Sequence, residues 1–263
     1  MTVQRGGYNM NFGLNLYSLR KQIATKEDFI ATLGRLKDMG YDYFQFSGAP
    51  FDKEVIKEAC LKTGMPVVLT HCPIDKALNN PIELVDEHKA VGCDNIGLGW
   101  MEFKKMTDEE VYQNIQKLKT ANDNVVNAGG KYFYHNHNHE FLKLTNGKRI
   151  FDVILETIPN LNITLDTFWL QAGGVSITDY VSLCKGRLEC VHLKDFLPIF
   201  NDGQPFSAKF APVGQGNINF EKVISSMQDA NVKYYLVEQD DATDYDDPFK
   251  QVETSIKYLK NNF

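Results

Sequence analysis

The sequence predicts an α/β protein, a single (β/α)8 TIM barrel over residues 1–263 with residues 1–9 as an N-terminal extension. Short apolar runs alternate with longer segments of helical periodicity along the whole chain. Eight such pairs occur, and the 222 residues from Leu16 to Glu238, divided over seven intervals, give about 32 residues per unit. That length suits one strand, one helix and two loops, and no linker or change of composition marks a second domain.

The first half of the chain shows the alternation most regularly. A strand at residues 11–16 precedes a helix at residues 26–39, for which Thr25 and Asp28 form a capping box and Gly40 is the stop. The further strands of this half are expected at residues 41–46, 66–70, 95–99 and 132–137. The helices between them are expected at residues 52–63, from Pro81 to the stop at Gly92, and from Thr107 to the stop at Gly129.

The second half keeps the order with less regular spacing. Strands are expected at residues 162–166, 188–193 and 234–238, and helices near residues 151–157, 177–185, 218–230 and 248–260. A doubly wound open sheet also alternates strands with helices, but it usually carries a glycine-rich turn after its first strand. Here Gly214 and Gly216 come late and follow no strand, so they make a poor dinucleotide fingerprint and the barrel is favoured.

Composition and charge restrict the class of partner. Hydrophobic residues make up 43% of the chain and charged residues 24%, as in an ordinary globular protein, and the net charge is −6. A negative surface gives no general attraction to nucleic acid or to anionic membranes. A small-molecule substrate is therefore expected, and a homo-oligomer stays open.

Cysteine usage and the lack of long apolar runs concern the compartment. The five cysteines form no CxxC pair, which indicates reduced thiols rather than a disulfide framework. No apolar run approaches the ~18 residues of a membrane span, and residues 1–9 lack the apolar stretch of a secretory signal. The sequence as it stands predicts a cytoplasmic protein; a chain whose leader had been removed would give the same result.

Polar side chains gather where four consecutive predicted strands end. They are Glu140 after the fifth strand, Asp166 in the sixth, His192 in the seventh and Glu238 in the eighth. Chemistry in such barrels lies at the carboxyl ends of the strands, where three carboxylates would repel one another unless a divalent cation bound them. A carboxylate-rich set favours Mn²⁺ or Mg²⁺, with Zn²⁺ or Co²⁺ as alternatives. Taken singly, each residue could instead be a helix cap or a loop residue.

These residues stand in segments that resemble a known family. The segments are Tyr134-His-Asn-His-x-x-Glu140-Phe141, Asp166 with Trp169 and Gly173-Gly174 after it, Val191-His192-Leu-Lys-Asp195, Glu238, and the opening Leu14-Asn-Leu-Tyr-Ser-Leu-Arg20. Together they resemble the sugar phosphate isomerase/epimerase family, also called xylose isomerase-like TIM barrels, from about residue 11 to residue 238. The motifs are typical of the superfamily rather than of one reaction.

The resemblance implies a metal-dependent isomerase or epimerase that acts on a carbohydrate or polyol derivative. Relatives that epimerise ketoses hold one divalent ion by a Glu, Asp, His, Glu set, which corresponds here to Glu140, Asp166, His192 and Glu238. The resemblance also makes Glu140 and Glu238 catalytic. One removes the proton next to the sugar carbonyl, the metal stabilises the enediolate, and the other returns a proton.

Two histidines are expected to bind the substrate. By resemblance His71, which closes the third strand, bonds a sugar hydroxyl, although a bond to a loop carbonyl is the alternative. His137 is expected at the pocket on the same grounds. Regular strand alternation would, however, turn all the histidines of residues 135–139 away from the face that Glu140 occupies.

Three further residues are candidates for the substrate pocket. Lys194 has the strand parity of His192 and should point inward, to hold an anionic group or polarise a carbonyl; an ion pair with Asp195 is the alternative. Trp169 could form an apolar wall for a sugar ring, or pack in the core. Gln45 departs from the family, because many relatives carry Glu there; Gln can bond a hydroxyl but cannot act as a base.

Three other functions fit parts of the pattern. The same metal and base could serve a lyase, a dehydratase or a keto-glycoside-cleaving enzyme, which product analysis would separate. A base-excision endonuclease of related fold would need several zinc ions and a DNA-binding face, and the net charge of −6 and the segment at residues 97–100 oppose it. A non-catalytic sugar-binding barrel would be expected to have lost a ligand or a glutamate, and both glutamates remain.

Overall fold

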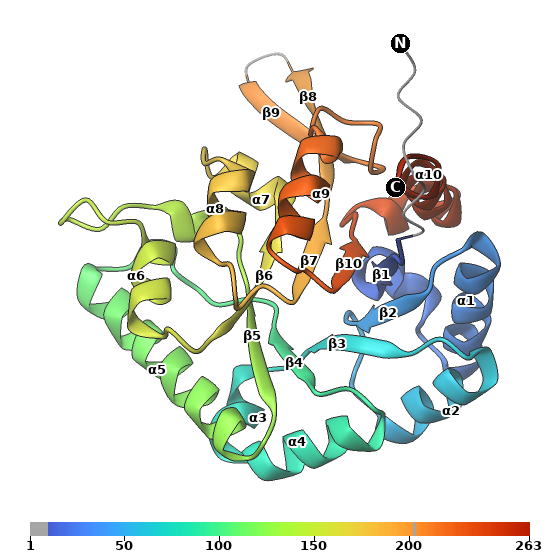
Figure 1. The fold of residues 1–263 in the computed structure, drawn as a ribbon, viewed down its shortest axis with the longest axis horizontal. Coiled ribbons are helices and arrows are strands. Elements are labelled where there is room, and N and C mark those ends of the chain that lie inside the picture. Colours follow the sequence, from blue (N-terminus) through green and yellow to red (C-terminus); the bar gives the residue numbers. More distant parts are fainter. Residues whose placement is uncertain (1–9, 202–203) are drawn as a thin grey trace.

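Eight parallel strands close into a barrel in the computed structural model of the chain, which describes residues 10–201 and 204–263 (Figure 1). Around the barrel the order is β1-β10-β7-β6-β5-β4-β3-β2, so the last strand of the barrel pairs with the first. The predicted (β/α)8 barrel is therefore confirmed. The predicted N-terminal extension, residues 1–9, lies outside the described residues.

The barrel strands are short and almost wholly buried, because helices cover their outer side and side chains fill the interior. All eight lie within two residues of their predicted bounds. They are β1 (Gly13–Asn15), β2 (Tyr43–Phe46), β3 (Val67–His71), β4 (Asn95–Leu98), β5 (Lys131–His135), β6 (Asn162–Asp166), β7 (Cys190–Leu193) and β10 (Tyr234–Val237).

The main helices lie outside the strands, and all eight predicted helices are present (Figure 1). Their ends follow the sequence signals: Thr107 and Glu110 form a complete capping box on α5, and Gly40 ends α1 in the left-handed conformation, at φ 101°. The helices are α1 (Lys26–Met39), α2 (Lys53–Thr63), α4 (Pro81–Ala90), α5 (Asp108–Asn127), α6 (Ile150–Thr157), α8 (Ile177–Leu183), α9 (Phe220–Asp229) and α10 (Pro248–Asn262).

Short elements that the sequence pattern did not predict occupy the carboxyl ends of the strands. They are the helices α3 (Ile74–Asn79) and α7 (Thr167–Ala172) and the 3-10 turns η1 (Leu16–Gln22), η2 (His139–Phe141) and η3 (Ala242–Asp244). An antiparallel hairpin of β8 (Asp195–Asn201) and β9 (Gln204–Ala211) follows β7 and extends beyond the barrel (Figure 1). At its base the ring of Phe210 contacts those of Phe168 and Trp169 in α7.

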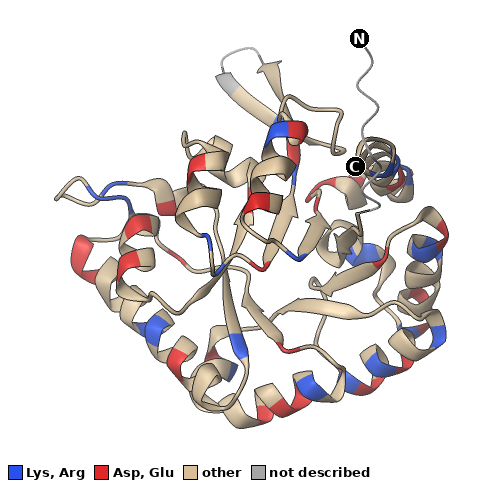
Figure 2. Cartoon of the chain, viewed as in Figure 1, with Lys and Arg blue, Asp and Glu red and all other residues tan. Residues whose placement is uncertain are grey.

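Charged side chains of both signs cover the outer helices, while the barrel strands are mostly uncharged (Figure 2). Among the described Asp, Glu, Lys and Arg residues, those classed as buried are Glu140, Asp166, Lys194, Asp195 and Glu238. Burying a charge is costly unless the charge is paired or bound. All five stand at or just beyond the carboxyl ends of strands, so the fold concentrates its buried charge at one face of the barrel.

The five cysteines are free thiols, as predicted. Cys72 directly follows β3 at the carboxyl end of that strand. Burial raises the pKa of its thiol. Within residues 10–201 and 204–263, no helix is long and apolar enough to cross a membrane.

Candidate active site

Four metal-ligand side chains converge at the carboxyl ends of neighbouring strands. His135 ends β5, Asp166 ends β6, His192 lies in β7 and Glu238 directly follows β10. One ligand atom from each lies within 4.8 Å of the others, and all four residues are buried. The barrel itself causes the convergence, because these strands are consecutive around the ring and Asp166 pairs in register with His192.

The four side chains leave polar atoms without hydrogen-bond partners. These atoms are His135 Nδ1, Asp166 Oδ2, His192 Nδ1 and Glu238 Oε2. His192 Nδ1 lies 3.0 Å from Glu238 Oε2, and Lys194 Nζ lies 3.4 and 3.2 Å from the two carboxylate oxygens, so the contacts within the set are ion pairs. Buried polar atoms are nearly always hydrogen-bonded in folded proteins, and these contacts leave His135 Nδ1 without any partner and the carboxylate oxygens with room for a cation. A divalent cation satisfies this donor set, and the residues present therefore fit a metal site.

Neighbouring groups orient three of these side chains by binding their other atoms. Asn15 Nδ2 donates to Glu238 Oε1 at 2.7 Å, and the Trp169 backbone N–H donates to Asp166 Oδ1 at 3.0 Å. His192 Nε2 donates to Gln45 Oε1 at 2.6 Å, which directs Nδ1 at the cluster, 3.0 Å from Glu238 Oε2. An amide oxygen is sufficient to accept this hydrogen bond. Gln45 therefore orients His192 and does not need to be a base.

Lys194 places a positive charge against the same carboxylates. Its Nζ lies 3.4 Å from Asp166 Oδ2, 3.2 Å from Glu238 Oε2 and 2.8 Å from Asp240 Oδ1. Burial alone would lower the pKa of Lys194, but the three carboxylates outweigh it and raise that pKa above its usual value. Lys194 points inward, as its strand parity indicated. The anionic groups that it binds are carboxylates of the protein itself.

The two cluster carboxylates respond differently to this surrounding. Burial raises the pKa of Asp166 to about 7, against the opposing effect of Lys194. Burial also acts on Glu238, but Lys194 and His192 together hold the pKa of that carboxyl below its usual value. Glu238 is therefore the carboxylate that stays ionised most firmly.

A cavity of ≈ 750 Å³ opens beside the cluster. It brings together most of the predicted site residues, since its lining includes His71, His137, Trp169, Lys194 and Glu238. Burial lowers the pKa of His71 to about 3 and that of His137 to about 2, so both imidazoles are neutral at neutral pH. Gln45 is not part of the lining; it lies behind His192, to which it is bonded.

The structure places Glu140 apart from the expected ligand position. β5 ends at His135 and the chain then turns into η2, so the strand alternation stops before Glu140 is reached. The carboxylate of Glu140 accepts from Tyr134 Oη at 2.5 Å and from the His137 backbone N–H at 2.9 Å. It is absent from both the metal-ligand cluster and the cavity lining, and His135 takes the fourth place. Burial raises the pKa of Glu140 to about 7.

The place of His71 depends on a glycine that directly follows the neighbouring strand β4. Its Nδ1 lies 3.2 Å from Ser47 Oγ, and its Nε2 is buried without a partner. A Cβ added at Gly99 would lie 2.6 Å from His71 Nδ1, so a larger residue there would displace the imidazole. The next residue, Trp100, contacts the rings of His137 and His139 at centroid distances of 4.6 Å.

Sequence reasoning did not select several residues of the site. They are His135, Asn15, Ser47, Trp100 and Asp240. The signal for Asp240 was available, since it follows Glu238 with the same strand parity. His135 and Asn15 stand in the segments that carry the family resemblance, so they too were within reach. Ser47 and Trp100 act through contacts with residues of other strands and loops, for which one sequence carries no signal.

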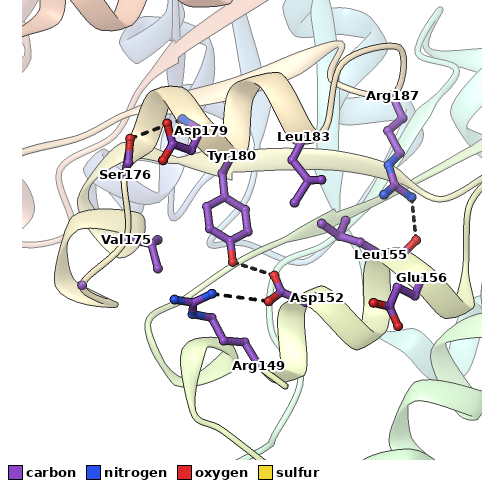
Figure 3. A pocket seen from close by; sticks show the side chains of 11 residues that line it. Arg149, Asp152, Leu155, Glu156, Val175, Ser176, Asp179, Tyr180, Leu183 and Arg187 are labelled. Carbon is purple, nitrogen blue, oxygen red and sulfur yellow. Dashed lines mark hydrogen bonds and ion pairs between the residues drawn. The ribbon is translucent and has the colours of Figure 1, made fainter. Parts of the chain in front are cut away.

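A second cavity, of ≈ 690 Å³, lies between α6 and α8 on the flank of the barrel (Figure 3). Its polar groups bind one another: Tyr180 Oη donates to Asp152 Oδ1 at 2.6 Å, and Arg149 Nη1 lies 3.5 Å from Asp152 Oδ2. Arg187 donates to the carbonyl of Leu155 at 3.2 Å. None of the residues that line it leaves a buried side-chain polar atom without a partner, so it shows no sign of reactive chemistry.

Several solved structures have a fold similar to that of this chain. A sugar phosphate isomerase/epimerase from Parabacteroides distasonis is 18% identical, with a TM-score of 0.78 over 99% of this chain and 97% of that one. A 3-keto-D-glucoside 4-epimerase from E. coli is 16% identical, with a TM-score of 0.69 over 96% and 99%. A D-allulose 3-epimerase from Methylomonas sp. in complex with D-allulose is 11% identical, with a TM-score of 0.71 over 97% and 98%.

Sequence comparison identifies the family. A search of curated proteins finds no match to this sequence. The family model described as "Xylose isomerase-like TIM barrel" matches residues 33–262. That range includes all four residues of the metal-ligand cluster and seven of the eight barrel strands. The resemblance inferred from the strand-end segments is confirmed, and the chain belongs to the xylose isomerase-like TIM barrel family.

Proposed function

We propose that this protein is a metal-dependent sugar isomerase or epimerase that moves a proton next to a carbonyl group. The observation that carries the proposal is the convergence of four buried side chains of metal-binding type, with ligand atoms within 4.8 Å of one another, beside a cavity of ≈ 750 Å³. Similar folds include epimerases that act on sugars. The proposed ligands are His135, Asp166, His192 and Glu238, with His135 in place of Glu140.

The proposed donor set narrows the choice of metal. Two imidazoles and two carboxylates suit Mn²⁺, Co²⁺ or Zn²⁺ better than Mg²⁺, which prefers oxygen ligands. When bound, such an ion would supply positive charge that polarises the sugar carbonyl and stabilises the negative charge that develops on enolisation.

Glu238 is the proposed base. Its Oε2 faces the cluster and the cavity, while Asn15 holds Oε1 and so sets the plane of the carboxylate. The neighbouring Lys194 ammonium keeps Glu238 ionised and can donate a hydrogen bond to the oxygen on which charge develops. Glu140, enclosed by its two donors, is proposed to fix the loop that carries His137.

The number of bases decides between isomerisation and epimerisation. A single base can remove a proton from one carbon and return it to the next on the same face, which interconverts an aldose and a ketose. Epimerisation needs a second group on the opposite face.

Solvent exchange tests the proposed reaction. We expect the Mn²⁺-loaded protein, incubated with D-allulose or D-fructose in D₂O, to introduce deuterium next to the carbonyl, because the removed proton passes through a solvent-exposed cavity. NMR of substrate and product detects it, and protein stripped of metal with a chelator is the control. Product formed without any deuterium would indicate hydride transfer between carbons and would exclude Glu238 as the base. An elimination product would favour a lyase or dehydratase.

Calorimetric titration with Mn²⁺ tests the proposed ligand set. His135→Ala removes a ligand and should weaken binding by about 100-fold or more, the upper end of what loss of an outer partner costs. Glu140→Gln should leave the affinity close to that of the wild type, because both carboxylate oxygens are bonded away from the cluster. If Glu140→Gln weakens Mn²⁺ binding and His135→Ala does not, Glu140 is the ligand and His135 is not.

A further inference from the structure

The cavity beside the metal-ligand cluster carries an excess of negative charge. Its lining holds three carboxylates, Asp75, Glu238 and Asp240, and one cation, Lys194. With the adjacent Asp166 the formal sum is four negative charges and one positive, or −3, and a bound dication brings it to −1.

Cations near the mouth are already engaged by other groups. Lys194 is shared by three carboxylates. Arg20 Nη1 donates to the carbonyls of Tyr17 and Asp240, at 3.0 and 2.7 Å. The exposed Lys104 lies over the ring of Trp100, with Nζ 4.8 Å from its centroid. None of these groups forms the cluster of free Arg or Lys side chains that usually receives a phosphate ester.

In the loop after β7, four backbone N–H groups bind the protein's own buried carboxylate, Asp195; neither Asp195 nor these groups line the cavity, which Lys194, the preceding residue, does. In barrels of this type the loops after the seventh and eighth strands often bind phosphate through backbone N–H groups. Here the carboxylate of Asp195 accepts from the N–H groups of Phe196, Gly214, Gly216 and Ile218, at 2.9, 3.0, 2.8 and 3.2 Å. A Cβ at Gly216 would clash with Asp195 Oδ1, so the loop is shaped around this carboxylate.

The aromatic part of the cavity lining suits an uncharged, hydroxylated ligand. Trp100, 46% exposed, and Trp169 both line the cavity, and His137 lies between them with ring centroids 4.6 and 5.2 Å away. Aromatic rings pack well against the C–H face of a sugar. Trp169 Nε1 and His137 Nδ1 are buried without partners and are free to bond hydroxyl groups.

We infer that the substrate of this site is an unphosphorylated sugar, and that Asp195 excludes phosphate from the loop where a barrel of this type would bind it. The inference rests on the proposed function and narrows its substrate class. A phosphate ester brings close to two negative charges into a cavity that stays negative even with a dication bound. A neutral sugar meets the aromatic wall and the unpartnered polar atoms without that cost.

Matched pairs of sugars test the inference. We would measure, by calorimetry on the Mn²⁺-loaded protein, the affinities of D-allulose against D-allulose 6-phosphate and of D-fructose against D-fructose 6-phosphate. The free sugar of a pair should bind at least about tenfold more tightly, a difference of about 1.4 kcal/mol. Equal or tighter binding of the esters, with deuterium exchange still occurring, would overturn this inference alone. Failure of both members of both pairs to bind or exchange would overturn the proposed function as well.

Two alanine variants test the role of Asp195. Asp195→Ala leaves four backbone N–H groups without their acceptor. The variant should bind the phosphate ester more tightly relative to the free sugar than the wild type does. Asp52→Ala is the matched control, because Asp52 also accepts two backbone N–H bonds, at the start of α2, and its loss should leave the ratio at the wild-type value. If Asp195→Ala does not fold, Asp195→Asn removes the charge alone and should shift the ratio in the same direction. An unchanged ratio in a folded Asp195 variant would overturn the assignment of Asp195.

Discussion

Glu238→Gln should lower turnover by roughly 10²–10⁴-fold, the range assigned to general acid–base catalysis. Gln keeps the size of the side chain and an oxygen for Asn15 Nδ2 to bond, but it cannot take a proton. Steady-state kinetics on a sugar that the wild type converts would give the change in turnover. Calorimetry with Mn²⁺ would show separately how much of the loss comes from weaker metal binding.

A matched glutamate on the opposite face of the barrel provides the control. Glu189 directly precedes β7 and binds Lys131 and Lys233, so Glu189→Gln removes a carboxylate far along the strand from the cluster. Its turnover should equal that of the wild type. Near-normal turnover in metal-loaded Glu238→Gln would show that Glu238 is not the base.

Lys194→Met should destabilise the metal-free protein by about 3–5 kcal/mol, the usual cost of breaking a buried ion pair by removing one partner. The loss leaves Asp166, Glu238 and Asp240 close together without a compensating charge. A bound divalent cation supplies the missing charge, so Mn²⁺ should raise the free energy of unfolding of the variant more than that of the wild type. Urea denaturation with and without Mn²⁺ measures both effects.

An exposed lysine serves as the comparison for Lys194. Lys257 pairs with Glu253 on the surface of α10, and Lys257→Met should change the free energy of unfolding by no more than about 1 kcal/mol, with or without metal. If Lys194→Met is as stable as Lys257→Met without Mn²⁺, the three carboxylates are not held together by Lys194. Their protonation would then be the explanation, as the raised pKa of Asp166 would permit.

The barrel was predictable because its signals are local and repeated. Each strand is a short apolar run, and stops such as Gly40, Gly64 and Gly92 separate the helix of one unit from the strand of the next. The hairpin of β8 and β9 was not predicted, because apolar and polar residues alternate only weakly in these strands and Pro198 interrupts the first of them. The Asp202-Gly203 dipeptide was an available hairpin signal in the sequence.

The site was predictable only in part. Asp166, His192 and Glu238 were identified because each belongs to a strand whose carboxyl end is clear from the sequence. The fourth position depended on where β5 ends: an extended strand turns Glu140 and His135 to opposite faces, and a strand that ends at His135 leaves only the histidine inside. The sequence signals for a strand end are weak, and a shift of two residues in the end of β5 exchanges His135 for Glu140 at this position.

The closure of the barrel by β1 and β10 also sets when the site can form. The bond from Asn15 to Glu238 joins residues 223 positions apart, and none of the four cluster residues precedes His135. A chain emerging from the ribosome therefore carries no complete cluster until its last barrel strand has been made and has paired with the first. Any cation that binds the cluster meets a nearly finished protein, so it stabilises the closed barrel and does nothing for the growing chain.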